Sequence, residues 1–204
     1  MERTPLKFTN FSDAFGLLVM FAVLWGALAA KLAWFIATVA TLPIVALIMY
    51  LIWLKYGEKR LRVNQCYAFI QFLMMTIYCC IPLFSIIWNT WVGVVTFLLH
   101  ALLFAVFYCY REPFRRMSEN RDVNGKKKDY PFMTWWLAAM GILGVSSFVF
   151  IFANVSFPPH EPEIILVTTF SYSFSFMPLT ASPMCLIHPE RLIEWKILHR
   201  KEYK

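Results

Sequence analysis

Two cysteines and a histidine are the residues of this sequence whose types and spacing point most directly to chemistry. Cys79 and Cys80 precede Asn89 by about ten residues, and His100 follows it at nearly the same separation. If a turn at Asn89 joins two antiparallel helices, all three lie at nearly one depth, because each helix rises about 1.5 Å per residue. A histidine in contact with a thiol can accept its proton and produce a nucleophile. The alternative is structural: the cysteines pack as small apolar residues, and His100 bonds a neighbouring backbone or hydroxyl group.

A hydroxyl-rich segment, residues 164–187, is a second candidate site. Pro178 and Pro183 each free a backbone carbonyl four residues earlier, and broken helices of this kind line substrate sites in transporters. The candidate residues for binding an uncharged or amphipathic solute are Ser171, Tyr172, Ser175, Pro178, Thr180 and Ser182. The alternative is a kinked structural helix whose hydroxyl groups bond the preceding turn of its own backbone.

Several kinds of chemistry lack their residues in this sequence. The long apolar segments contain no Asp or Glu, although ion-coupled transport needs an ionisable group at membrane depth. The sequence has no P-loop, GxSxG or HExxH motif. Its five cysteines have no CxxC or metal-type spacing. We therefore expect neither a metal site nor a cofactor, and enzymatic activity is not the favoured interpretation.

The arrangement of apolar residues predicts a single membrane domain over residues 1–204. Apolar and aromatic residues make up 60% of the chain and charged residues 15%, whereas a soluble domain has about 25% charged residues. A helix needs roughly 20 apolar residues to cross the hydrocarbon core. We predict an all-α bundle of about six transmembrane helices, over residues 14–30, 32–54, 65–87, 91–110, 133–153 and 164–187. A cleaved signal peptide is the alternative for the first of these segments.

The first two segments are predicted to form a hairpin that reverses near Lys31. Together they would make one helix about twice as long as a bilayer is thick, so the chain must turn. Small residues recur every four positions on both predicted helices, a pattern that allows close approach of helices in lipid. These residues are Ala22, Gly26 and Ala30 on the first helix and Ala33, Ala37 and Thr41 on the second.

The distribution of Lys and Arg predicts the orientation. If both termini are cytoplasmic, loops 55–64 and 111–132 and the basic amphipathic tail 188–204 are also inside. All of the 19 Lys and Arg residues except Lys31 then lie on the cytoplasmic side, as the positive-inside rule requires. The net charge of +7 is explained by this rule and by anionic lipid, so we expect a bilayer and no nucleic acid as the partner.

Three functional hypotheses remain open at this point. The first is a non-catalytic transport-associated or accessory, immunity-type component, acting through a membrane or cytoplasmic partner subunit docked on residues 111–132 and 188–204. The second is a transporter or binding subunit for an uncharged or amphipathic solute, lined by the segment 164–187. The third is a thiol-dependent membrane enzyme that uses Cys79 or Cys80 with His100.

Overall fold

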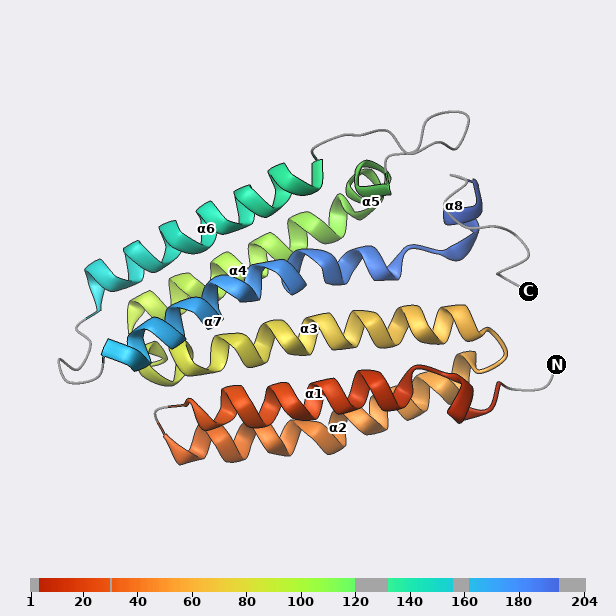
Figure 1. The fold of residues 1–204 in the computed structure, drawn as a ribbon, viewed down its shortest axis with the longest axis horizontal. Helices are drawn as coiled ribbons and strands as arrows, with labels where there is room; N and C mark the ends of the chain where they lie inside the picture. Colours follow the sequence, from red (N-terminus) through yellow and green to blue (C-terminus); the bar gives the residue numbers. More distant parts are fainter. Residues whose placement is uncertain (1–3, 30, 120–131, 156–161, 195–204) are drawn as a thin grey trace.

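The fold consists of long helices packed side by side (Figure 1). The structure is a computed structural model, and it describes residues 4–29, 31–119, 132–155 and 162–194. These residues contain helices and no strand. The long helices are α1 (Phe11–Ala27), α2 (Leu32–Tyr56), α3 (Arg60–Ile87), α4 (Trp91–Cys109), α6 (Phe132–Asn154) and α7 (Pro162–Ala181). Each matches one predicted apolar segment, so the all-α helix bundle is confirmed.

Short helices occupy parts of the chain that were predicted as loops or as ends of segments. They are η1 (Leu6–Phe8), α5 (Arg111–Glu119), η2 (Ser182–Leu186) and α8 (Pro189–Glu194). The loop 111–132 thus begins with a helix, which Pro113 tolerates in its first turn. The Phe114 ring stacks on Phe107 of α4 at 4.6 Å and fixes α5 there. Helix α3 begins at Arg60 rather than at residue 65, so it includes part of the basic loop 55–64.

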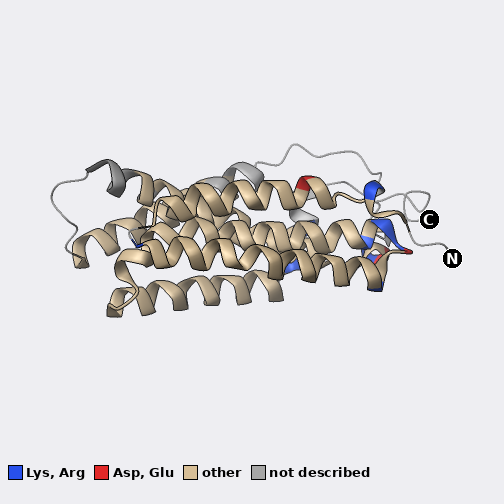
Figure 2. Cartoon of the chain, turned by 90° about the horizontal axis from the view of Figure 1, so that it is seen from below, with Lys and Arg blue, Asp and Glu red and all other residues tan. Residues whose placement is uncertain are grey.

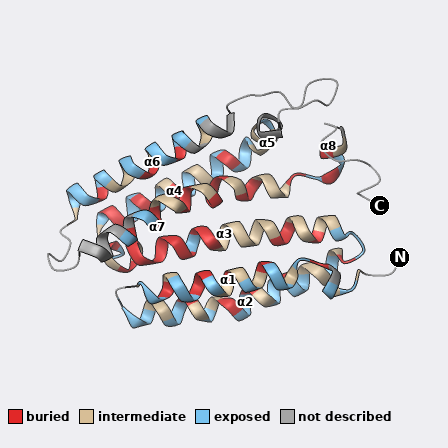
Figure 3. Cartoon of the chain, viewed as in Figure 1, coloured by how far each residue is buried: buried red, intermediate tan, exposed pale blue. Residues whose placement is uncertain are grey.

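Helices α3 and α7 are the central elements of the bundle. Helix α3 contacts α1 and α2 on one side and α7 on the other, and α7 also contacts α4 and α6. By contrast, α3 and α4 touch each other at few positions although they follow one another in the chain. Figure 3 shows buried residues concentrated along α3 and α7. One apolar cluster therefore lies among α1, α2 and α3, and another among α3, α4, α6 and α7.

The hairpin of α1 and α2 turns where it was predicted to turn. Helix α1 ends at Ala27, and α2 begins after Lys31. Gly26 is buried at the contact, where a Cβ atom would lie 3.1 Å from the Phe35 ring and 3.5 Å from Thr38. The predicted small-residue stripe on α2 is wrong, because Ala33 and Ala37 are exposed. The buried face of α2 instead carries larger side chains, which bury more apolar area: Thr38, Leu42, Val45 and Met49.

Among the described residues, three helices, α2, α3 and α4, are by length and composition able to cross a membrane. Helix α1 is a shorter apolar helix, and so is the stretch Ala138–Asn154 of α6. The outward surface is apolar too, because many large apolar side chains on it are more than half exposed. Among them are Ile36, Ile44, Leu47, Phe97, Leu98, Leu102, Ile142 and Val149. A surface of this kind is typical of a membrane protein.

Most of the charged residues in the described part of the chain lie at one end of the bundle (Figure 2). This basic end is formed by residues 4–9, the α2–α3 connection and residues 186–194. Hydrogen bonds hold its parts together: the Thr4 amide donates to the Gly57 carbonyl at 2.8 Å, and the Trp53 indole donates to the Thr4 carbonyl at 2.9 Å. Lys31, in the α1–α2 turn, lies at the opposite end.

Candidate functional site

His100 lies where α3, α4 and α7 meet, and it brings together residues from both candidate sites. Its Nε2 atom is 3.5 Å from the Cys80 Sγ atom of α3 and 3.1 Å from the Ser175 Oγ atom of α7. All three side chains are buried. The predicted cysteine–histidine pair and the hydroxyl-rich helix thus form one polar cluster, which we call the His100 cluster: Thr76, Cys80, Thr96, His100 and Ser175.

Hydrogen-bond partners define which nitrogen of His100 carries the proton. Its Nδ1 atom lies 3.1 Å from the Thr96 carbonyl oxygen, which can only accept, so Nδ1 donates and Nε2 accepts. Ser175 has one hydroxyl proton, and the shorter of its contacts is to the Tyr172 carbonyl at 2.6 Å. The Nε2 lone pair therefore faces the Cys80 thiol, a weak donor.

Aromatic rings fix the orientation of the imidazole. The Phe176 ring stacks on His100 with centroids 4.8 Å apart, and the Tyr172 ring lies at 5.2 Å. The Thr76 hydroxyl of α3 donates to the Phe72 carbonyl at 3.0 Å and also lies 3.4 Å from the Ser175 carbonyl of α7, so it is held within the cluster. The His100 ring is therefore positioned by both neighbouring helices.

Cys79 and Cys80 lie at nearly one depth, but their side chains face different parts of the bundle. Consecutive helical residues differ by about 100° around the axis, because a turn has 3.6 residues. Cys80 consequently faces His100, whereas Cys79 is fully buried in the cluster of α1, α2 and α3. The Cys79 carbonyl accepts a 2.6 Å hydrogen bond from the Ser171 hydroxyl of α7. Of the two candidate cysteines, the structure brings only Cys80 to His100.

A cavity of about 340 Å³ lies between α3 and α4, next to the His100 cluster. It opens outward between the two helices, because the lining residues Ile77, Phe97 and Ala101 are exposed on the bundle surface. Helix α7 contributes Leu179 to its wall. The polar side chains of the lining are Thr76, Cys80 and His100, with Trp34 and Trp88 toward one end, and the other lining residues are Leu73, Ile81, Phe84 and Phe104.

The candidate Ser and Thr hydroxyls of α7 and η2 donate to backbone carbonyls, whereas the buried Tyr172 hydroxyl bonds no backbone carbonyl among the described residues. None of the predicted solute-binding residues, Pro178 included, lines this cavity. Ser171 and Ser175 donate as described, Thr180 donates to Phe176 at 3.0 Å, and Ser182 donates to Leu179 at 3.0 Å. The Leu179 carbonyl is the one that Pro183 frees, so it is satisfied locally. Helix α7 runs through Pro178 to Ala181 and becomes a 3₁₀ helix from Ser182. The helix therefore continues through Pro178, and its geometry changes only next to Pro183.

The sequence patterns did not predict a cavity between α3 and α4, nor two members of the His100 cluster. Thr76 precedes Cys80 by four residues and Thr96 precedes His100 by four, so each pair shares a helix face. That spacing was the available signal. The cavity exists because α3 and α4 are separated, and neither helix sequence alone predicts this separation. It arises because α7 packs against both.

The geometry of the site is the basis on which its function is inferred. Among the described residues, no three His, Cys, Asp or Glu side chains are grouped so that they could hold a metal ion. No protein-family model, no curated protein and no solved structure matches this chain.

Proposed function

We propose that this protein is a multi-pass membrane protein that binds an uncharged or amphipathic molecule with an alkyl chain between α3 and α4. The observation that carries the proposal is the apolar cavity, which opens sideways from the bundle and ends at His100 and Cys80. Its opening lies between exposed apolar side chains of Ile77 and Phe97. A ligand dissolved in the bilayer could enter there without crossing water.

The polar groups of the cavity define which molecules it would select. Lipid tails are as apolar as leucine, so moving an apolar ligand from the bilayer to an apolar cavity wall lowers its free energy little. A ligand O–H or N–H that replaces the Cys80 thiol, a weak donor, at the Nε2 lone pair of His100 would gain a hydrogen bond, which adds about 0.5–1.5 kcal/mol. The proposed ligand therefore carries a hydroxyl or amide N–H group on an alkyl chain.

The charge distribution supports an orientation with the basic end in the cytoplasm. Lys55, Lys59, Arg60 and Arg62 surround the α2–α3 connection, whereas Lys31 lies in the turn at the other end. Cytoplasmic loops carry an excess of Lys and Arg. Both termini would then be cytoplasmic, and the turns at Lys31 and Asn89 would face outward.

This orientation predicts which positions react from outside the cell. In a cysteine-free background, Asn89→Cys should react with a membrane-impermeant maleimide in intact cells, whereas Lys59→Cys should react only after permeabilisation. Both positions are exposed, so access to the side chain does not explain a difference. Labelling of Lys59→Cys in intact cells would overturn the orientation.

Blocking the cavity should abolish ligand binding. Ala101 lines the cavity and is exposed, so Ala101→Trp would fill the opening between the helices. Ala105 lies one turn further along α4, is also exposed and does not line the cavity. With a photoactivatable long-chain alcohol in proteoliposomes, Ala101→Trp should reduce crosslinking to α3 and α4 about tenfold, or about 1.4 kcal/mol. Ala105→Trp is the matched control and should not reduce it.

The ligand's polar group can be tested separately. The free alcohol should compete with the photoactivatable probe, and its methyl ether should compete about tenfold less well, since the ether cannot donate to Nε2. Equal crosslinking in Ala101→Trp and wild type would contradict the proposal for the cavity itself. Equal competition by alcohol and ether would contradict the role given to His100.

A second candidate function, thiol chemistry on the bound molecule, is favoured by the 3.5 Å contact of Cys80 with His100. Both residues border the cavity, so a bound molecule would reach the sulfur. The partner-subunit hypothesis depends on residues 111–132 and 188–204, of which 120–131 and 195–204 lie outside the described residues. The described residues add no observation in its favour.

A further inference from the structure

A second pocket, of about 420 Å³, lies at the basic end of the bundle. It is formed by the last turn of α2, the α2–α3 connection, the first turn of α3 and the junction between η2 and α8. Its lining residues are Lys55, Tyr56, Glu58, Lys59, Arg62, His188 and Pro189. Ligand pockets span about 300–1,000 Å³, so this one has the size of a binding site.

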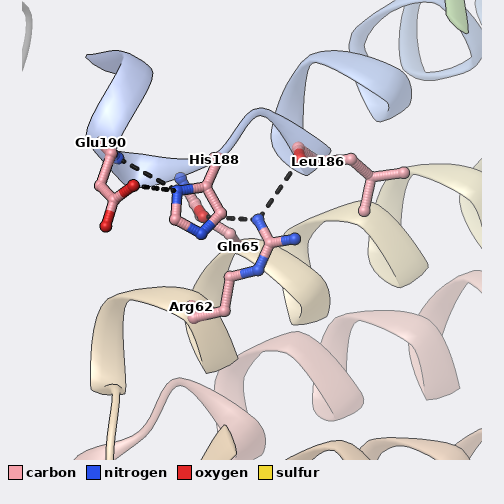
Figure 4. Close-up of polar contacts among 5 residues, drawn as sticks. All are labelled: Arg62, Gln65, Leu186, His188 and Glu190. Atoms are coloured by element: carbon pink, nitrogen blue, oxygen red, sulfur yellow. Dashed lines mark hydrogen bonds and ion pairs between the residues drawn. The ribbon is translucent and has the colours of Figure 1, made fainter. Parts of the chain in front are cut away.

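Hydrogen bonds across the pocket hold its walls together. The Arg62 Nη1 atom of α3 donates to the Leu186 carbonyl at the end of η2 at 3.3 Å, and it also donates to Gln65 Oε1 at 3.3 Å. Figure 4 shows Arg62 reaching toward Leu186, with His188 and Glu190 beside it. The His188 Nδ1 atom lies 3.7 Å from the Glu190 carboxylate. Segments far apart in the sequence thus form one pocket.

The pocket has an excess of positive charge. Lys55, Lys59 and Arg62 line it against a single carboxylate, Glu58. Within the described part of the chain, neither lysine forms an ion pair with a carboxylate. Like charges that share a concave surface raise the local potential, and an anion placed between them lowers it. The pocket therefore fits a negatively charged group.

The apolar surface next to the pocket indicates the source of that group. Leu47, Leu51 and Lys55 follow one another at four-residue intervals on α2, so they share a helix face. Leu47 is 57% exposed and Leu51 is 52% exposed. On this face, the apolar side chains of Leu47 and Leu51 are followed by the ammonium group of Lys55 at the pocket. A phospholipid has the same order of groups, because its acyl chains are joined to a charged headgroup.

We propose that this pocket binds the phosphate group of an anionic phospholipid headgroup. The phosphate lies against Lys55, Lys59 and Arg62, and the acyl chains run along Leu47 and Leu51. The same cations would also bind free inorganic phosphate. The exposed apolar side chains of Leu47 and Leu51 on α2 favour a lipid over free phosphate, because acyl chains can pack on them. The proposal requires insertion in a membrane but is independent of any ligand in the α3–α4 cavity.

The test compares lipid retention by pocket variants in native mass spectrometry. The full-length protein is taken from nanodiscs that contain phosphatidylglycerol or phosphatidylcholine. Removing a basic residue near an anionic membrane surface costs about 1 kcal/mol, or about fivefold in affinity. Lys55→Gln with Lys59→Gln should lower retention of phosphatidylglycerol about 25-fold. Arg60→Gln is the matched control, because Arg60 is exposed at the same end but does not line the pocket.

A second arm separates the two sources of phosphate. Inorganic phosphate is added to the detergent-solubilised protein, and the change in Tm is measured for the same variants. Selective loss of phosphatidylglycerol from the double variant supports the headgroup site. In another outcome, phosphate raises the Tm of every form except the double variant, and no form prefers one lipid. That outcome supports a phosphate site but overturns the lipid source. An equal effect of the double variant and Arg60→Gln in both arms overturns the site itself.

Discussion

Replacing Gly93 by alanine should lower the free energy of unfolding by about 2–3 kcal/mol, the upper part of the range for overpacking. A Cβ atom at Gly93 would stand inside contact distance of the Ile87 carbonyl oxygen and 3.1 Å from the Ile87 carbonyl carbon. That carbonyl cannot move freely, because it accepts the Thr90 amide at 2.9 Å and the Thr90 hydroxyl at 2.7 Å. The substitution therefore disturbs the turn between α3 and α4.

The loss is measured by unfolding the purified protein in mixed micelles with increasing sodium dodecyl sulfate, followed by circular dichroism. Gly141→Ala is the matched control, since among the described residues no atom beyond the adjoining backbone of α6 lies within 4 Å of a Cβ at Gly141. It should change the free energy of unfolding by no more than about 1 kcal/mol, the difference in helix propensity between glycine and alanine. Similar losses in both variants would show that the Ile87 contact does not limit stability.

Cys80 should react with an apolar maleimide, and His100→Gln should slow this reaction about 100-fold, the lower end of general-base catalysis. The His100 Nε2 atom lies 3.5 Å from the Cys80 sulfur and is unprotonated, because Nδ1 donates to Thr96. A glutamine can fill a similar volume but cannot accept the thiol proton. The rate is followed by mass spectrometry in a protein whose other four cysteines are replaced.

Cys79 provides the control for access, since it is adjacent in sequence but buried away from the cavity. A variant that retains only Cys79 should stay unmodified under the same conditions. Ser175→Ala should change the Cys80 rate little, because the Ser175 hydroxyl proton is directed to the Tyr172 carbonyl. If His100→Gln leaves the Cys80 rate unchanged, the thiol hypothesis fails, whereas the binding hypothesis is unaffected.

The helices could be predicted because each depends on local sequence. A long apolar segment can satisfy its backbone in lipid only as a helix, and the polar residues Lys31 and Asn89 mark turns that separate one segment from the next. The boundaries were less accurate at α3 and α5, where polar residues continue a helix beyond its apolar part. Hydropathy marks the apolar part of a helix, and hydrogen bonding and packing set its ends.

The His100 cluster was only half predictable for the same reason. Helix rise gives depth, so equal separations from Asn89 placed Cys79, Cys80 and His100 at one level. The rotation of each helix about its axis depends on its neighbours. Ser175 belongs to the cluster because α7 packs against both α3 and α4. Its contact with His100 joins residues 75 positions apart in the sequence.

The long helices, the basic residues at one end of the bundle and the depth of the reactive side chains could all be predicted from the sequence. Each follows from the composition of a continuous segment. The contact of Cys80 rather than Cys79 with His100, the backbone hydrogen bonds of Ser171, Ser175 and Thr180, and the two pockets are known only from the packed structure. Lys55 and His188, for example, share the basic pocket because η2 returns to α3. Such contacts depend on how helices pack and rotate against one another, which no single segment encodes.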